Sequence, residues 1–366
     1  MSEPSEYASY GRLIWRRFKR HKLGVVGGIV TMMIYVVALF VEFIAPYNPE
    51  DFSPRALFSP PQAIRLLEST PEGGRRLRLH ALASKSTVDY TTGQRTYVPD
   101  PDHVVELGFF VKGDPYRMWG FVPWDRHLFG PVDPHERVYF LGTDRLGRDM
   151  LSRTIYATRI SMTIGLIGVG LSLVLGLIIG GASGYFGGWI DVVIQRVIEF
   201  LQSLPSIPLW IGLAAAIPPT VPPVETYFLI TVILSILGWT GLGRVVRGRF
   251  MALKAEDFVV AAQLDCCPPS RIIWRHMIPN FLSHIIAVVT LAIPGMIIAE
   301  TSLSYLGIGL RQPVVSWGVL LQEAQNLRSI SAAPWLFVPG VAVVVSVLAL
   351  NFLGDGLRDA GDPYET

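Results

Sequence analysis

The chain has 366 residues, of which 51% are hydrophobic and only 16% are charged. This composition is too apolar for an ordinary soluble domain and indicates a protein that crosses a membrane several times. The formal net charge of +2 says little about partners, and no nucleic-acid partner is expected. The two cysteines, Cys266 and Cys267, are adjacent and have no ligands at metal-site spacing, so neither a disulfide framework nor a metal site is expected.

Six apolar runs are long enough to cross about 30 Å of hydrocarbon, which takes about 20 residues of helix. In chain order they cover residues 23–45, 160–182, 192–217, 227–243, 281–298 and 335–353. The third run contains Pro205 and Pro208 and is expected to be kinked. The sequence therefore predicts an all-α integral membrane protein with six transmembrane helices, the first of them over residues 23–46.

Positive charge sets the expected orientation. Residues 1–22 carry six Lys and Arg directly before the first apolar run, which the positive-inside rule places in the cytoplasm. That run ends without a small-residue cleavage site, so a retained anchor is favoured over a cleaved signal peptide. Alternation then places the basic loop 244–280 and the C-terminus in the cytoplasm as well.

The segment 47–140 is predicted to be an extracytoplasmic insertion between the first two transmembrane helices. From residue 48 to residue 159 the chain has 15 Lys and Arg, but loops longer than about 60 residues cross membranes largely regardless of charge. Many prolines and aromatic residues indicate a small folded unit. Residues 87–98 alternate like a strand, and one short run does not establish a sheet.

Residues 142–149 have the spacing of a phosphate-binding loop. Arg148 replaces the lysine of that motif and no Ser or Thr follows it, so nucleotide binding is not expected. We expect a turn that leads back to the membrane, with local ion pairs among four charged residues: Asp144, Arg145, Arg148 and Asp149.

Glycines recur every fourth residue at positions 176, 180, 184 and 188. Such a ladder removes side chains from one helix face and lets a neighbouring backbone approach. The pattern predicts close helix packing, against either this chain or another subunit.

Glu300 is a carboxylate at the end of the fifth apolar run. A buried charge there costs energy unless it faces a partner or a wet cavity. Two interpretations stay open, namely a pathway or inter-helix role and simple exposure at the outer interface. No metalloprotease motif, nucleophile elbow or other catalytic constellation is present, so the chain is not expected to be an enzyme.

The loop 256–280 reads EDFVVAAQLDCCPPSRIIWRHMIPN. It resembles the cytoplasmic loop of the permease subunits of ABC importers, which carries an alanine pair, a glycine a few residues on, and a closing proline. In that family the loop forms coupling helices that seat in a groove of the ATPase subunit. The resemblance implies an ATPase-coupling site made of six residues: Glu256, Asp257, Ala261, Ala262, Cys266 and Pro279.

Four further stretches, at residues 141–153, 159–165, 302–309 and 354–359, are similar to the second permease of dipeptide and oligopeptide importers. The resemblance implies the type I ABC importer permease fold, with residues 141–366 as the permease core that holds transmembrane helices 2–6. It also implies a second homologous permease, two ATP-binding subunits that hold ATP and Mg, an extracytoplasmic substrate-binding protein, and no cofactor in this chain.

Two features depart from the family pattern. Cys266 stands where the family loop has glycine, so the turn is expected to be made differently. The insertion is also longer than the resemblance leads one to expect, and its position suggests contact with the binding protein.

The leading hypothesis is a permease subunit of the cell inner membrane, multi-pass, that forms half of a translocation pathway for peptides. Relatives of this kind also carry oligosaccharides or nickel complexes, and these cargoes stay open. Rivals from other classes are a membrane scaffold or sensor without transport and an intramembrane enzyme.

Overall fold

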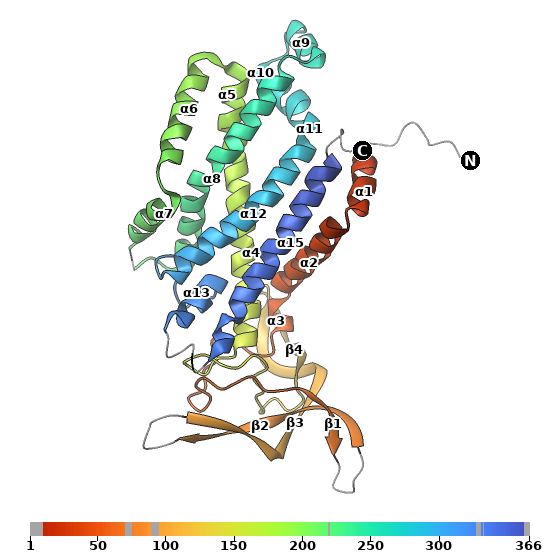
Figure 1. Ribbon diagram of the computed structural model, residues 1–366, viewed down its shortest axis with the longest axis vertical. Helices are drawn as coiled ribbons and strands as arrows, with labels where there is room; N and C mark the ends of the chain where they lie inside the picture. The colour runs from red at the N-terminus through yellow and green to blue at the C-terminus, as the bar shows by residue number, and fades with distance from the viewer. Residues whose placement is uncertain are drawn as a thin grey trace, which may run out of the picture.

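The computed structural model describes residues 10–69, 75–88, 95–218, 220–326, 331 and 333–361. Residues 1–9 of the predicted basic N-terminus and residues 89–94 of the alternating run lie outside the described part. A bundle of long helices forms one end of the molecule, and a β-sheet forms the other (Figure 1). The described start of the chain, its end and helix α9 all lie at the end of the bundle that faces away from the sheet.

The helices before the sheet are α1 (Tyr10–Arg20), α2 (Lys22–Leu39) and α3 (Val41–Ile44). After the sheet come α4 (Met150–Leu175), η1 (Gly176–Gly180), α5 (Gly181–Phe186), α6 (Gly188–Ser203), α7 (Ser206–Ala215) and α8 (Pro223–Leu253). The connection that follows holds α9 (Asp257–Leu264), α10 (Pro269–Arg271), η2 (Ile272–Met277) and α11 (Ile278–Asn280). The last elements are α12 (Leu282–Tyr305), α13 (Trp317–Gln322), η3 (Glu323–Gln325), η4 (Pro334–Phe337) and α15 (Val338–Gly361).

Five helices among the described residues are long and apolar enough to cross a membrane: Lys22–Leu39, Met150–Phe186, Pro223–Leu253, His284–Tyr305 and Pro334–Gly361. They match the first, second, fourth, fifth and sixth predicted spans. The third predicted span is the pair α6 and α7, which bends by 86°. The expected kink is thus confirmed, and a count of six holds only if this bent pair is one span.

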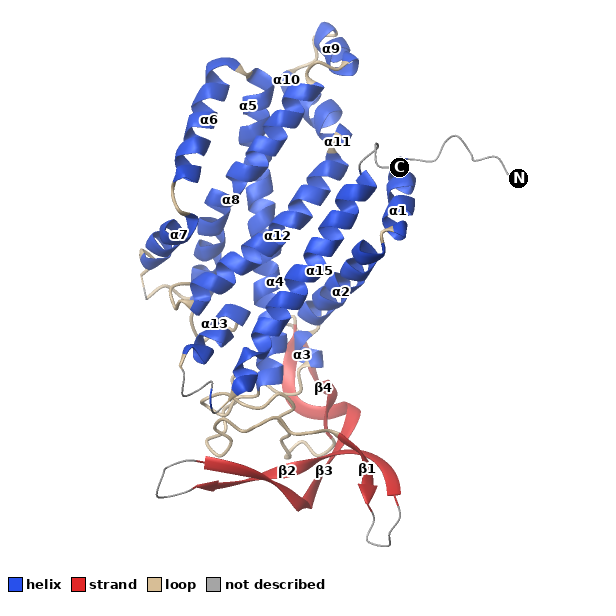
Figure 2. Cartoon of the chain, viewed as in Figure 1, coloured by secondary structure: helices blue, strands red, loops and turns tan. Residues whose placement is uncertain are grey.

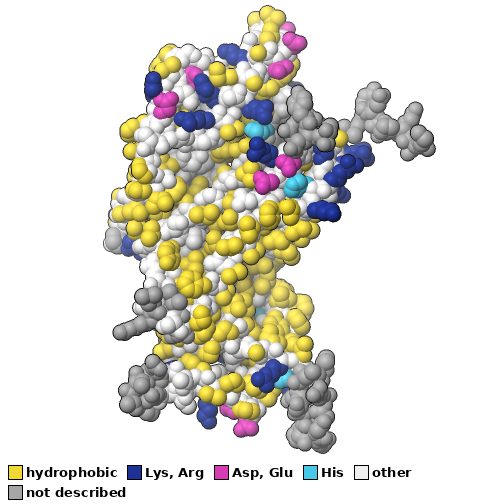
Figure 3. Space-filling view, viewed as in Figure 1, with side chains coloured by type: hydrophobic (Ala, Val, Ile, Leu, Met, Phe, Trp, Pro, Cys, Tyr) yellow, Lys and Arg dark blue, Asp and Glu magenta, His cyan; other side chains and the backbone are white. Residues whose placement is uncertain are grey.

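The surface of the bundle supports a membrane setting. In the space-filling view, hydrophobic side chains cover the visible side of the bundle, while Lys and Arg gather near the end that carries α1 (Figure 3). Met32 and Val341, for example, are 70% and 61% exposed in the isolated chain. Exposed apolar side chains of this density fit contact with lipid rather than water.

The glycine ladder packs against α8 of the same chain, which confirms the predicted close approach for its first three members. A Cβ on Gly176 would lie 3.0 Å from the Leu242 Cβ, and one on Gly184 would lie 2.7 Å from the Arg247 carbonyl oxygen. Gly188 has a positive φ of 58° and open space around it, so it ends the ladder without a helix contact.

Replacing Gly180 by leucine is expected to destabilise the bundle by about 3 kcal/mol, because its side chain would overlap the backbone of Gly243. The thermal unfolding midpoint of the detergent-solubilised protein measures the loss. Gly170 on α4 is the matched control, since a Cβ there meets no atom within 4 Å. Gly170→Ala should leave the midpoint unchanged or raise it, and an equal loss in both variants would contradict this packing.

The segment between α3 and α4 forms an antiparallel sheet in the order β1 (Arg65–Ser69), β2 (Arg75–Val88), β3 (Arg95–Met118) and β4 (Val122–Pro131). The first part of β3 pairs with β2 and its last part pairs with β4. A small core of Ala81, Val105, Leu107 and Val138 holds the sheet together. The sheet corrects the all-α expectation (Figure 2). Its strands carry a weak sequence pattern, and pairing between strands makes them stable.

Candidate functional site

Helix α9 stands out at the tip of the bundle, on the connection between α8 and α12 (Figure 1). Glu256 is its N-cap residue and Asp257 lies in its first turn, where negative charge complements the helix dipole. Val259 and Ala262 are buried against Ile272 and Met277. One side of α9 is therefore fixed to the ends of the long helices.

The opposite side of α9 is exposed and largely apolar. Asp257, Val260, Ala261 and Leu264 fall on one face by the helical period of 3.6 residues, away from the two buried positions. Leu264 is 78% exposed, and Trp274 on the neighbouring η2 is 63% exposed. We call the face formed by Asp257, Val260, Ala261 and Leu264 the α9 face.

The turn after α9 uses Cys266 in the left-handed conformation, with φ of 54°. The Cys267 amide donates to the Ala262 carbonyl and the Cys266 amide donates to the Gln263 carbonyl, at 3.1 and 3.0 Å. These two bonds define a Schellman motif, in which glycine usually takes the left-handed position. The expectation of a different turn was therefore wrong. Cys266 takes the position that glycine usually takes in a Schellman motif, and its Cβ makes the left-handed conformation less favourable than it would be for glycine.

Cys266→Gly is expected to stabilise the protein by about 1 kcal/mol, because a residue with a Cβ pays about that much in the left-handed region. Cys266→Ala is the control, since it keeps the Cβ and should give no gain. A comparison of thermal unfolding midpoints tests the pair. Equal midpoints for the glycine and alanine variants would contradict the strained turn.

Pro279 lies in α11 and is exposed, at the end of a distorted stretch. The π-helical segment η2 precedes it, and Phe281 breaks the path into α12 with φ of −123° and ψ of 19°. Proline has no amide hydrogen to continue the helix ladder, which accounts for an interruption here. The structure thus places Pro279 beside α12 and away from the α9 face.

Polar contacts join the C-terminal part of α8, which leads into α9, to neighbouring helices. Arg247 on α8 donates to both carboxylate oxygens of Asp191 on α6, at 2.5 and 2.6 Å. The Lys254 ammonium donates to the Tyr185 carbonyl at 2.8 Å and lies over the ring of the same tyrosine. These short, directional contacts hold α5 and α6 against the end of α8 that leads into α9.

Glu300 is fully buried where α4, α12 and the residue that caps α13 meet. Ser304 and Ser316 donate to one carboxylate oxygen, both at 2.8 Å. Ser161 on α4 donates to the other at 3.5 Å and accepts the Trp317 amide at 3.1 Å. Exposure at the interface is therefore the wrong interpretation, and Glu300 joins three helical elements.

A second polar cluster lies at the sheet end of the bundle. Asp144 accepts from Arg148 at 2.6 Å and also from Arg153, and all three residues are buried. Glu323, which follows α13, accepts from Arg148 at 3.0 Å. The predicted local ion pair between Asp144 and Arg148 is confirmed, and the structure extends it to Arg153 and Glu323.

Asp149 does not join these ion pairs and instead caps α4. Its carboxylate accepts from the Ser152 amide at 2.7 Å. Complete burial raises the pKa of Asp149 to about 6, while the Ser152 hydrogen bonds act in the opposite direction.

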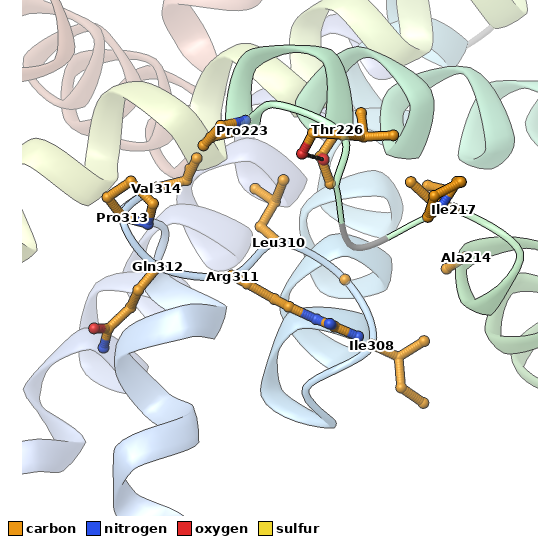
Figure 4. Close-up of a pocket in the computed structure, with 13 residues that line it drawn as sticks. Ala214, Ile217, Pro223, Thr226, Ile308, Leu310, Arg311, Gln312, Pro313 and Val314 are labelled. Carbon is orange, nitrogen blue, oxygen red and sulfur yellow. Dashed lines mark hydrogen bonds between the residues drawn. The ribbon is translucent and has the colours of Figure 1, made fainter.

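A cavity of about 300 Å³ opens between the α7–α8 connection and the segment after α12 (Figure 4). Most of its described lining residues have apolar side chains, and Arg311 is the one cation among them. The Arg311 Nε donates to the Gly307 carbonyl at 3.2 Å. The sequence did not reveal this cavity, because its residues come from segments far apart in the chain. It also did not reveal the serines around Glu300, because Ser161 is 139 residues away and Ser316 lies beyond the end of α12.

Fold and sites together define a helical membrane protein with a sheet at one end and a small exposed helix at the other. Its sequence matches the family described as "Binding-protein-dependent transport system inner membrane component" over residues 172–364. Residues 9–61 match the "N-terminal TM domain of oligopeptide transport permease C". The chain belongs to the binding-protein-dependent inner membrane components, and the resemblance inferred from its motifs is confirmed.

Curated relatives are peptide permeases. The oligopeptide transport system permease protein OppC of Haemophilus influenzae is 38% identical over 66% of this chain and 75% of its own length. The dipeptide transport system permease protein DppC of Bacillus subtilis is 29% identical over 97% of this chain and 86% of its own length. These relatives are permease subunits and not ATPases.

Among solved structures, the MetNI methionine ABC transporter in inward-facing conformations has a similar chain. The match has 15% identity and a TM-score of 0.45, and it covers 58% of this chain and 97% of that chain.

Proposed function

We propose that this chain is the permease subunit of an ATP-driven importer and forms half of a translocation pathway for di- and oligopeptides. The observation that carries the proposal is the similarity to a dipeptide permease along 97% of this chain. The chain itself makes and breaks no bond in this scheme. Partner subunits bind ATP and Mg and hydrolyse the nucleotide.

The α9 face is the proposed contact with an ATPase subunit. Its exposed apolar side chains suit a groove on a partner protein. The side chains of Val259 and Ala262 anchor the same helix to the bundle, so closure of the ATPase would move α9 as a rigid lever. In this role Glu256 and Asp257 begin the helix, and Cys266 ends it.

The proposed orientation places α9 and both chain ends in the cytoplasm and the sheet outside. What supports it is the basic helix α1, which lies at the same end of the bundle as α9 (Figure 1). A binding protein would then deliver cargo at the sheet end, where the cavity beside Arg311 also lies. The proposed assembly holds a second homologous permease and two ATP-binding subunits.

Reconstitution tests the cargo. The complete transporter in proteoliposomes, supplied with its binding protein and ATP, should accumulate labelled di- to pentapeptides. Oligosaccharides and nickel complexes are the matched alternative cargoes and should not accumulate. Uptake of either of these without peptide uptake would overturn the proposed cargo, and binding without any uptake would favour a scaffold or sensor.

A further inference from the structure

The β3–β4 hairpin ends in a cluster of exposed aromatic and aliphatic side chains. Phe121 is 71% exposed and Phe110 is 58% exposed. Three more residues of the hairpin are exposed by 36% to 45%: Trp119, Val122 and Trp124. We call these five residues, four of them at or near the turn and Phe110 further back on β3, the hairpin tip. So much exposed apolar surface is costly in water.

The hairpin tip is attached to the end of the first membrane-spanning helix. The Trp119 indole donates to the Leu39 carbonyl at 2.8 Å, and its ring lies 5.7 Å from that of Phe40. The ring of Phe43 lies 5.8 Å from Trp124 and 5.9 Å from Phe110. These contacts fix the height of the hairpin tip relative to the membrane.

That height corresponds to the edge of the hydrocarbon layer. Helix α2 has 18 residues and is about 27 Å long, whereas the hydrocarbon core is about 30 Å thick. If Lys22 lies at one boundary, Leu39 therefore lies close to the other. Tryptophan concentrates at this level in membrane proteins, because its ring is apolar and its N–H is polar.

The hairpin tip also continues a surface that already faces lipid. On α2, three apolar side chains are exposed: Met32 by 70%, Val36 by 45% and Leu39 by 50%. Phe40 follows them in the chain and packs against Trp119, so the apolar surface of α2 continues onto the hairpin tip. Arg117 on the same hairpin is an exposed cation, whereas Lys112 lies 3.7 Å from the Asp125 carboxylate. A basic side chain beside aromatic ones suits the phosphate groups of a lipid interface.

Two of the five residues also have an unfavourable backbone conformation. Trp119 has a φ of 53° and Phe110 a φ of 55°, in the region that glycine and asparagine favour. Large aromatic residues there cost roughly 1–2 kcal/mol each. Glycine or asparagine would adopt this conformation more cheaply at both positions, Trp119 in the turn and Phe110 within β3, so the aromatic rings serve a purpose beyond the backbone path.

We propose that the hairpin tip inserts into the interfacial region of the lipid bilayer, in the leaflet next to the sheet, and anchors the sheet to the membrane surface. The occupant of this surface is lipid. The anchor fixes the sheet beside the end of α2, whatever cargo the transporter carries.

Site-directed spin labelling tests the anchor. With Cys266 and Cys267 replaced by alanine, Phe121→Cys is labelled with a nitroxide, and the protein is placed in nanodiscs of phosphatidylcholine and phosphatidylglycerol. The label should collide more with oxygen, which concentrates in lipid, than with a water-soluble nickel chelate. Ser86→Cys, on the exposed part of β2, is the control and should show the opposite preference.

Val122→Cys provides a second position in the hairpin tip, should the Phe121 variant fail to fold. Nickel accessibility at both positions equal to that at Ser86 would overturn the proposal. So would lipid-like shielding that arises only after the binding protein is added, because a protein would then be the occupant. The readout needs neither ATP nor peptide, so its failure is distinct from failure of the proposed transport function.

Discussion

Ala261→Arg is expected to abolish ATP-driven uptake while the chain still folds and inserts into the membrane. Ala261 is exposed on the α9 face, so a longer side chain extends outward and not into the core of its own subunit. In a closely packed groove the added bulk costs about 1–3 kcal/mol, which corresponds to a roughly 5- to 150-fold loss of docking affinity. An uptake assay in proteoliposomes, together with a co-purification of the ATPase subunits, measures both effects.

Ala261→Ser is the matched control, because serine is nearly as small as alanine and should keep uptake. Ala262→Arg should instead impair folding, since Ala262 is buried in the core beneath α9. Full uptake by the Ala261→Arg variant would refute the coupling role of the α9 face.

Asp144→Ala is expected to destabilise the protein by about 3–5 kcal/mol. The Asp144 carboxylate is fully buried and accepts from the Arg148 and Arg153 side chains and from two backbone amides. Without Asp144, the buried guanidinium groups of Arg148 and Arg153 share a single carboxylate, that of Glu323. Removing one partner of a buried ion pair costs about 3–5 kcal/mol, because the other charge stays buried without compensation. The half-life of the solubilised protein at raised temperature measures the change.

Arg145 lies next to this aspartate and is exposed, so Arg145→Ala is the matched control. It should change stability by no more than about 0.5 kcal/mol. A similar half-life for both variants would show that the buried cluster does not hold the sheet end of the bundle together.

The membrane helices could be predicted from the sequence because lipid imposes a strong local pattern. An uncharged run of about 20 residues has few alternatives to a spanning helix. The bend near Pro205 also followed from residue type, because proline lacks the amide hydrogen that continues a helix and often bends or ends it. Both features depend on neighbours in the sequence.

Features that depend on distant neighbours were missed. Helix α13 lies between the fifth and sixth apolar runs, where no element was predicted, yet Trp317 and Leu320 are almost fully buried in the main core. Ser316 before an apolar run was an available signal, because serine is a frequent helix N-cap. The burial of Glu300 could not be foreseen, since two of its three partner serines, Ser161 and Ser316, lie outside its own helix.

The most direct test of the α9 face as the ATPase contact uses the two native thiols. Cys266 is exposed and Cys267 is partly buried, and both lie directly after α9. A membrane-impermeant maleimide is applied to oriented vesicles with and without the ATPase subunits. We expect labelling from the cytoplasmic side that the ATPase subunits block. Labelling from the outer side would overturn the orientation, and cytoplasmic labelling that the ATPase subunits leave unchanged would contradict the coupling role.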